Sequence, residues 1–226
     1  MKITTSLENI KSFGGLNFVS DQYDSLCLSE LITEHLGKRP SQAQYSFSDV
    51  IKNLWAITFA GGDCAEDIQT NLKEELKQIQ NLNVCSPDTI LGVQKLLAEG
   101  KEIHISPSKT VNEFSKHSTL NALNLAFLVE TKTLTTGQLH DFDYDNQFIP
   151  NEKYDAKRSY KMKDGYFPGV ATIGRHIVYI ENRNGNCNVK YKQAETLQAA
   201  YDLLKSQNIR IDRSRMDCGS FTKEII

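Results

Sequence analysis

The stretch Gln138-Leu139-His140-Asp141-Phe142-Asp143-Tyr144-Asp145 alternates strictly between apolar and acidic residues in its second half. In an extended chain the two aromatic rings fall on one face, and Asp141, Asp143 and Asp145 fall on the other. Aspartate is depleted in strands, and like charges on one face repel each other. The stretch therefore predicts a strand with one buried face and an acidic face that needs a physical explanation.

Two explanations of the acidic face are open at the level of the residues. A divalent cation would relieve the repulsion, since Mg²⁺ prefers oxygen ligands and usually takes one or two carboxylates together with water and phosphate oxygens. Alternatively, the strand lies at the edge of a sheet and exposes a solvated acidic face.

Further strands and a helix are predicted on the C-terminal side of this stretch. The strands cover residues 165–173, 176–181 and 210–217, and a helix over residues 193–204 precedes the last of them. The last strand ends at Asp217, before the turn 218–220. Loops that follow the carboxyl ends of strands commonly carry the chemistry of α/β sheets. An Asx-turn before Gly219 is the alternative interpretation of Asp217.

The front of the chain is predicted to be helical. Apolar residues recur at helical spacing over residues 23–36, 46–57, 65–80, 86–97 and 112–128. Ser46 is predicted to cap the second of these helices, with Asp49 completing a capping box. The fold class is therefore α+β, with a helical N-terminal domain over residues 1–130 and an α/β domain over residues 131–226.

The charge of the chain is nearly balanced, with 26 basic and 28 acidic side chains and a net charge of -2. The chain therefore lacks the overall positive charge that would by itself indicate binding to nucleic acid. Residues 151–192 nevertheless contain nine Lys and Arg against four Asp and Glu, with tyrosines between them. This segment is predicted to contact phosphates in a salt-sensitive way, and a solvated loop that binds nothing is the other interpretation.

Cysteine usage and hydropathy indicate the compartment. The five cysteines form no C-x-x-C pair, which favours free thiols in a reducing environment. The N-terminus has no apolar leader segment, and the apolar stretch 123–129 is too short to span a bilayer. A cytoplasmic protein is expected.

Several short motifs occur in a specific order over residues 138–224. They are Asp143-Tyr144-Asp145-Asn146, Gly165-Tyr166-Phe167-Pro168-Gly169-Val170, Arg183-Asn184-Gly185-Asn186 and Arg215-Met216-Asp217-Cys218-Gly219-Ser220-Phe221. In this order they resemble the DDE transposases of bacterial insertion sequences, in particular their first-aspartate strand, "GY-x-P" strand, "R-x-GN" turn and second-aspartate strand. Gln147 departs from the family, which usually has Thr there.

The resemblance implies a partial RNase H-like core over residues 131–226, of order β-β-β-α-β, that holds two Mg²⁺ or Mn²⁺ ions. It assigns the first catalytic aspartate to Asp145, with Asp143 as the fallback ligand, and the second to Asp217. The implied partner is double-stranded DNA with terminal inverted repeats, near a bacterial nucleoid. A homodimer is a further expectation, whereas a membrane and a small-molecule cofactor are not expected. The residues expected to contact DNA are Lys153, Lys157, Arg158, Lys161, Arg183 and Arg215.

The family's third carboxylate is a Glu on a later helix. Glu224 follows Asp217 too closely to serve, Glu195 precedes Asp217, and the sequence ends at Ile226. We therefore expect an N-terminal portion of a cut-and-paste transposase that is inactive alone. One alternative is a non-catalytic DNA-binding remnant that occupies transposon ends. Another is an unrelated metal-dependent nuclease, which requires a third carboxylate from within the chain.

Overall fold

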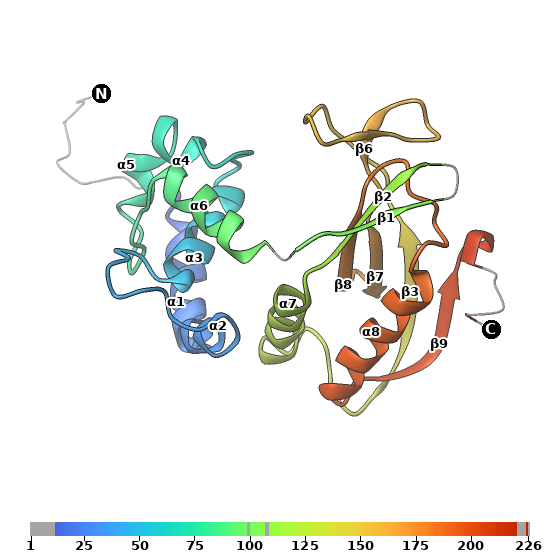
Figure 1. Cartoon of the computed structure of the whole chain (residues 1–226). Coiled ribbons are helices and arrows are strands. Elements are labelled where there is room, and N and C mark those ends of the chain that lie inside the picture. The colour runs from blue at the N-terminus through green and yellow to red at the C-terminus, as the bar shows by residue number, and fades with distance from the viewer. Residues whose placement is uncertain (1–11, 99, 107–108, 221–224, 226) are drawn as a thin grey trace, which may run out of the picture. The chain divides into compact units, whose positions relative to one another are not determined.

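The computed structural model describes residues 12–98, 100–106, 109–220 and 225 (Figure 1). The chain divides into two compact units, one up to Leu97 and one from Ala98 onward. The first unit is helical and the second combines helices with sheets, so the predicted α+β class is confirmed.

The first unit consists of short helices around an apolar core. Ser46 caps α3, because its Oγ accepts a hydrogen bond from Asp49 N at 3.0 Å while Asp49 Oδ2 accepts one from Ser46 N at 2.8 Å. The predicted capping box is thus present. The helices are α1 (Gly15–Ser25), α2 (Leu28–Leu36), α3 (Phe47–Phe59), α4 (Asp67–Thr70), α5 (Lys73–Leu76) and α6 (Pro87–Leu97).

Two helical predictions for this unit need correction. The helix expected over residues 23–36 is interrupted, since Cys27 has a left-handed backbone with φ of 51°. The helix expected over residues 65–80 is instead the two short helices α4 and α5.

The second unit is organised around a six-stranded sheet with the order β1-β2-β8-β7-β3-β9. β3 and β9 are parallel, and every other neighbouring pair is antiparallel. The strands are β1 (Glu102–Ile105), β2 (Val111–Lys116), β3 (Leu139–Asn146), β7 (Gly169–Ile173), β8 (His176–Arg183) and β9 (Arg210–Met216). The sheet thus places β3 between β7 and β9, away from either edge.

Two helices, α7 (Ser118–Glu130) and α8 (Gln193–Ser206), lie against the same face of this sheet (Figure 1). The apolar core forms between these helices and the inward face of β3, β7 and β8. Its buried members include Leu125, Phe142, Ala171, Val178 and Leu204. Burial of this face explains why the aromatic side of β3 points to the helices and its aspartates point away from them.

A second, three-stranded sheet interrupts the connection between β3 and β7. It contains β4 (Ile149–Pro150), β5 (Lys157–Arg158) and β6 (Asp164–Tyr166) in the order β4-β6-β5. The basic segment over residues 151–192 includes two strands of this small sheet, β5 and β6.

The division between the units lies earlier in the chain than residue 130. The helix expected over residues 112–128 begins only at Ser118, because residues 111–116 form β2 and pair with β8. The predicted strands from residue 138, over residues 176–181 and over residues 210–217, and the predicted helix over residues 193–204, are confirmed as β3, β8, β9 and α8. The strand predicted over residues 165–173 is instead divided between β6 of the small sheet and β7 of the large one. Across the described residues, the structure contains no helix whose length and hydropathy would allow it to cross a bilayer.

Candidate metal and nucleic-acid site

Arginines of β9 pair with the first two aspartates of β3. Arg213 donates from Nε and Nη2 to the two carboxylate oxygens of Asp141, at 3.0 and 2.8 Å. Arg215 does the same to Asp143, at 2.6 and 2.8 Å. The repulsion expected along this face is therefore relieved by arginines, through two-pronged hydrogen bonds whose geometry suits a carboxylate.

The two sequence-level explanations of the acidic face both need revision at these positions. β3 is an interior strand of its sheet, so the edge-strand interpretation is wrong. The guanidinium of Arg215 holds the pKa of Asp143 below its usual range and occupies both of its oxygens. Asp143 therefore lies beside the candidate site with its carboxylate already paired.

Asp145 and Asp217 lie at the carboxyl ends of the two neighbouring strands. The parallel register pairs Asp143 with Arg215 and ends with Tyr144 and Met216, the residues immediately before Asp145 and Asp217. Both residues are exposed, and neither forms an ion pair within the part of the chain that the structure describes.

Asp217 lies at the start of a tight turn. β9 ends at Met216, and the 3-10 turn η1 (Cys218–Ser220) follows. Ser220 N donates to Asp217 O at 3.1 Å, and Ser220 Oγ donates to Asp217 Oδ1 at 3.2 Å. Asp217 and Met216 also line a groove of about 820 Å³ between α8 and β9.

The two carboxylates suit a hard divalent cation. Magnesium usually takes one or two carboxylates and completes its shell with water and phosphate oxygens. The described residues contain no group of three or more His, Cys, Asp or Glu side chains placed to hold a metal ion. Glu195 lies near Lys192 at 3.4 Å, and Glu224 lies outside the described residues. The site thus offers two protein carboxylates, with no third one from the described chain.

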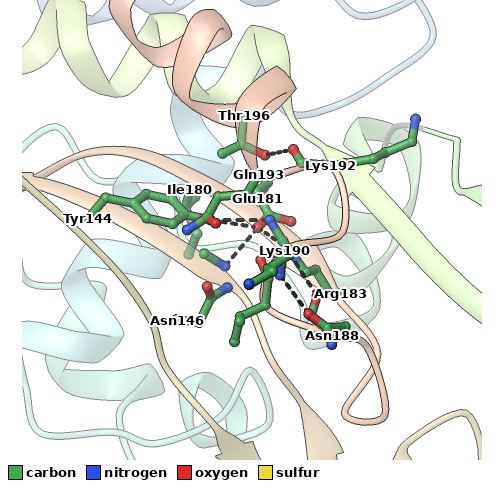
Figure 2. A network of polar contacts seen from close by, with 12 residues as sticks. Tyr144, Asn146, Ile180, Glu181, Arg183, Asn188, Lys190, Lys192, Gln193 and Thr196 are labelled. Carbon is green, nitrogen blue, oxygen red and sulfur yellow. Dashed lines mark hydrogen bonds and ion pairs between the residues drawn. The ribbon is translucent and has the colours of Figure 1, made fainter. Parts of the chain in front are cut away.

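A buried polar network lies beside this site, and sequence reasoning did not find it (Figure 2). Arg183 donates to Glu181 Oε1 at 2.5 Å, to Tyr144 Oη at 3.1 Å and to Val189 O at 2.8 Å. Glu181 Oε1 also accepts from Gly169 N at 3.0 Å. The two charged side chains have exposed fractions of 0% and 1%. The spacing of two residues between Arg183 and Glu181, the last residue of the strand predicted over residues 176–181, was the available signal.

Burial raises the pKa of Glu181 to about 7, although Arg183 opposes this shift. Loss of hydration therefore outweighs the attraction of the neighbouring guanidinium. Within the described structure, Glu181 Oε2 is buried without a hydrogen-bond partner, which is consistent with a carboxyl group that binds a proton readily.

The residues expected to contact DNA fall into two groups. Arg183 is buried, whereas Arg215 is exposed and donates to Asp143 from Nε and Nη2, which leaves its remaining guanidinium donors at the surface. The remaining four lie in the segment of the small sheet, where Lys153, Arg158 and Lys161 are exposed and Lys157 is half-buried. Two tyrosines beside them, Tyr154 and Tyr160, have exposed fractions of 98% and 73%.

Comparisons with protein-family models, with curated proteins and with solved structures give no match for this chain.

Proposed function

We propose that the second unit is an RNase H-like core of a DDE-type DNA transposase and that Asp145 and Asp217 hold its divalent metal. The observation that carries the proposal is the β3–β9 register. Asp141 and Asp143 are each paired with an arginine of β9, whereas Asp145 and Asp217 follow the last paired residues of the two strands and form no ion pair among the described residues. Carboxylates without a cationic partner are available as oxygen ligands for a divalent cation.

The order and direction of the strands support the proposal. β3, β7 and β8 form an antiparallel series, α8 follows, and β9 returns parallel to β3. This is the β-β-β-α-β arrangement that the resemblance implied. The carboxyl ends of β3 and β9 coincide, which is where chemistry is commonly found in sheets of this kind.

Different residues of the chain would bind the metal and the DNA. Bound Mg²⁺ or Mn²⁺ would polarise a phosphate and activate a water or a DNA 3′-hydroxyl. Asp145 and Asp217 would supply the oxygen ligands, while Lys153, Arg158 and Lys161 would hold the phosphate backbone. Such contacts bind double-stranded DNA with little dependence on sequence. Recognition of terminal inverted repeats and a homodimer stay predictions.

A DNA-binding protein without cleavage activity is the second candidate. It is favoured by the presence of two, rather than three, carboxylates at the site among the described residues. A protein of this kind would retain the exposed lysines and occupy transposon ends in competition with an active enzyme.

Manganese titration tests the proposed metal site. We expect the unaltered chain to bind Mn²⁺ and the double variant Asp145→Asn, Asp217→Asn to lose it with little change in Tm. Asp212→Asn is the matched control, because Asp212 is an exposed acid on the same strand. Unchanged Mn²⁺ affinity in the double variant would refute the site.

A cleavage assay on terminal-repeat DNA then separates the two candidates. Metal-dependent nicking that the double variant abolishes supports the transposase. Retained DNA binding without nicking, in the presence of bound Mn²⁺, supports the DNA-binding protein.

A further inference from the structure

We propose that Gln193 and Ser220 are positioning residues for Asp217. Gln193 donates a hydrogen bond to the Ser220 hydroxyl, which in turn donates one to the Asp217 carboxylate. The inference rests on the proposed metal site and adds to it the residues that fix one of its ligands. It concerns the first residue of α8 and the last residue of η1, neither of which the sequence motifs assign a role.

The two hydrogen bonds have a defined direction. Gln193 Nε2 donates to Ser220 Oγ at 2.6 Å. An amide nitrogen can only donate, so the Ser220 oxygen accepts this bond and keeps its own hydrogen free. That hydrogen is directed to Asp217 Oδ1, where the distance from Ser220 Oγ is 3.2 Å. The arrangement therefore presents a donor to one carboxylate oxygen of Asp217.

Burial makes this arrangement rigid. The exposed fractions of Gln193 and Ser220 are 1% and 5%, whereas Asp217 is exposed. The turn is also tight at Gly219, where a Cβ would lie 3.1 and 3.2 Å from the Asp217 carboxylate oxygens and 3.3 Å from Val189 Cγ2. The donor is thus held by the interior of the protein, and the ligand it orients faces solvent.

The buried network anchors the other end of this arrangement. Arg183 donates to Val189 O at 2.8 Å and to Asn188 O at 3.4 Å, in the segment that leads into α8. Glu181 in turn holds Arg183 at 2.5 Å. Hydrogen bonds therefore join β8 to this segment, and Val189 of the segment lies next to Gly219 in the turn that follows Asp217.

Residues that hydrogen-bond a metal ligand tune affinity without touching the ion, and their loss typically costs about 10-fold or more in metal affinity. With one oxygen of Asp217 held by Ser220, the other oxygen is oriented for a cation. Removal of the Ser220 hydroxyl lets the Asp217 carboxylate rotate. Binding of the ion must then also order the carboxylate, which weakens the affinity.

Manganese affinity of single variants tests the inference. We expect Ser220→Ala to weaken Mn²⁺ binding about 10-fold, Gln193→Met to weaken it in the same direction, and Ser220→Thr to restore it, since threonine keeps the hydroxyl. Ser214→Ala is the matched control, because it removes a hydroxyl that bonds Tyr201 at 2.8 Å on the same groove and leaves Asp217 untouched. Tm values equal to that of the unaltered chain exclude a general loss of structure.

The outcomes separate this inference from the metal site itself. If Asp217→Asn loses Mn²⁺ while Ser220→Ala and Gln193→Met bind it with unaltered affinity, the site stands and the positioning role is overturned. If the unaltered chain binds no Mn²⁺, the proposed site fails and the inference fails with it. Weakening in Ser220→Ala with recovery in Ser220→Thr supports both.

Discussion

Asp143 and Arg215 face each other across the parallel strands β3 and β9, and both carboxylate oxygens are bound by the guanidinium at 2.6 and 2.8 Å. Asp141 and Arg213 repeat the arrangement one step earlier. Asp145, the third aspartate on this face, lies beyond the last residue that β3 pairs with β9 and has no arginine partner among the described residues. Two acids bound by arginines are therefore followed by one acid that could hold a cation.

This difference predicts which aspartate of β3 holds the metal. Asp145→Asn should weaken Mn²⁺ binding by about 10-fold or more, because it removes a charged ligand. Asp143→Asn should leave Mn²⁺ affinity within about twofold, because Arg215 already occupies that carboxylate. Isothermal titration with Mn²⁺ measures both constants. A larger loss in Asp143→Asn would move the ligand to position 143.

The buried Glu181 predicts a particular dependence of stability on pH. Its folded-state pKa is raised to about 7 from an ordinary value of 4.5, so its stabilising contribution is complete below pH 4.5 and is lost as the pH rises through 7. Its surroundings include Arg183, Tyr144 and Cys187, and the last two have raised pKa values and stay neutral in this window. The unfolding free energy of the second unit should therefore fall by roughly 1–3 kcal/mol between pH 4.5 and 8.

Glu181→Gln should remove that decline, because glutamine has no proton to lose. Urea denaturation at a series of pH values, followed by a signal from the second unit, measures it. A slope in the variant equal to that of the unaltered chain would show that another group causes the dependence.

The sequence predicted this sheet well where side-chain alternation is local. Phe142 and Tyr144 are buried and Asp143 and Asp145 lie on the opposite face, as the alternation required. The sequence pattern did not predict contacts between residues that are distant in the chain. The arginine partners of Asp141 and Asp143 are 72 residues away, and only the β3–β9 register reveals them.

The phosphate contact expected of Arg183 did not take into account that this side chain is buried. An arginine between asparagines in a turn-like motif suggests a phosphate contact, yet its spacing of two from Glu181 places both on the inward face of β8. For the strand β2, apolar spacing over residues 112–128 favoured a helix, whereas pairing with β8 selected a strand for its first part. Tertiary contacts overrode local propensity at both places.

Gly169 offers a direct test of the close packing around Glu181. A Cβ at this position would overlap with the Tyr144 hydroxyl and with Glu181 Oε1, which accepts a hydrogen bond from Gly169 N. Gly169→Ala should therefore destabilise the second unit by about 2–4 kcal/mol, measured by denaturant unfolding. Gly92→Ala is the control, since Gly92 lies within helix α6 with open space around it and should gain up to about 1 kcal/mol. A neutral Gly169→Ala would show that β7 can move away from β8.

The exposed cations of the small sheet predict how DNA binding depends on salt. Each phosphate contact contributes about 0.9 to the slope of log affinity against log salt concentration for duplex DNA. Replacing Lys153, Arg158 and Lys161 with glutamine should reduce that slope by roughly 2–3 and weaken binding alike for terminal-repeat and unrelated duplexes. The control replaces the exposed Lys38, Lys73 and Lys95, which removes the same charge from the helical unit. Fluorescence anisotropy at several salt concentrations measures both. Equal slopes for the two triple variants would mean that net charge, rather than this surface, governs the binding. The two variants lose the same number of positive charges and differ only in where those charges lie.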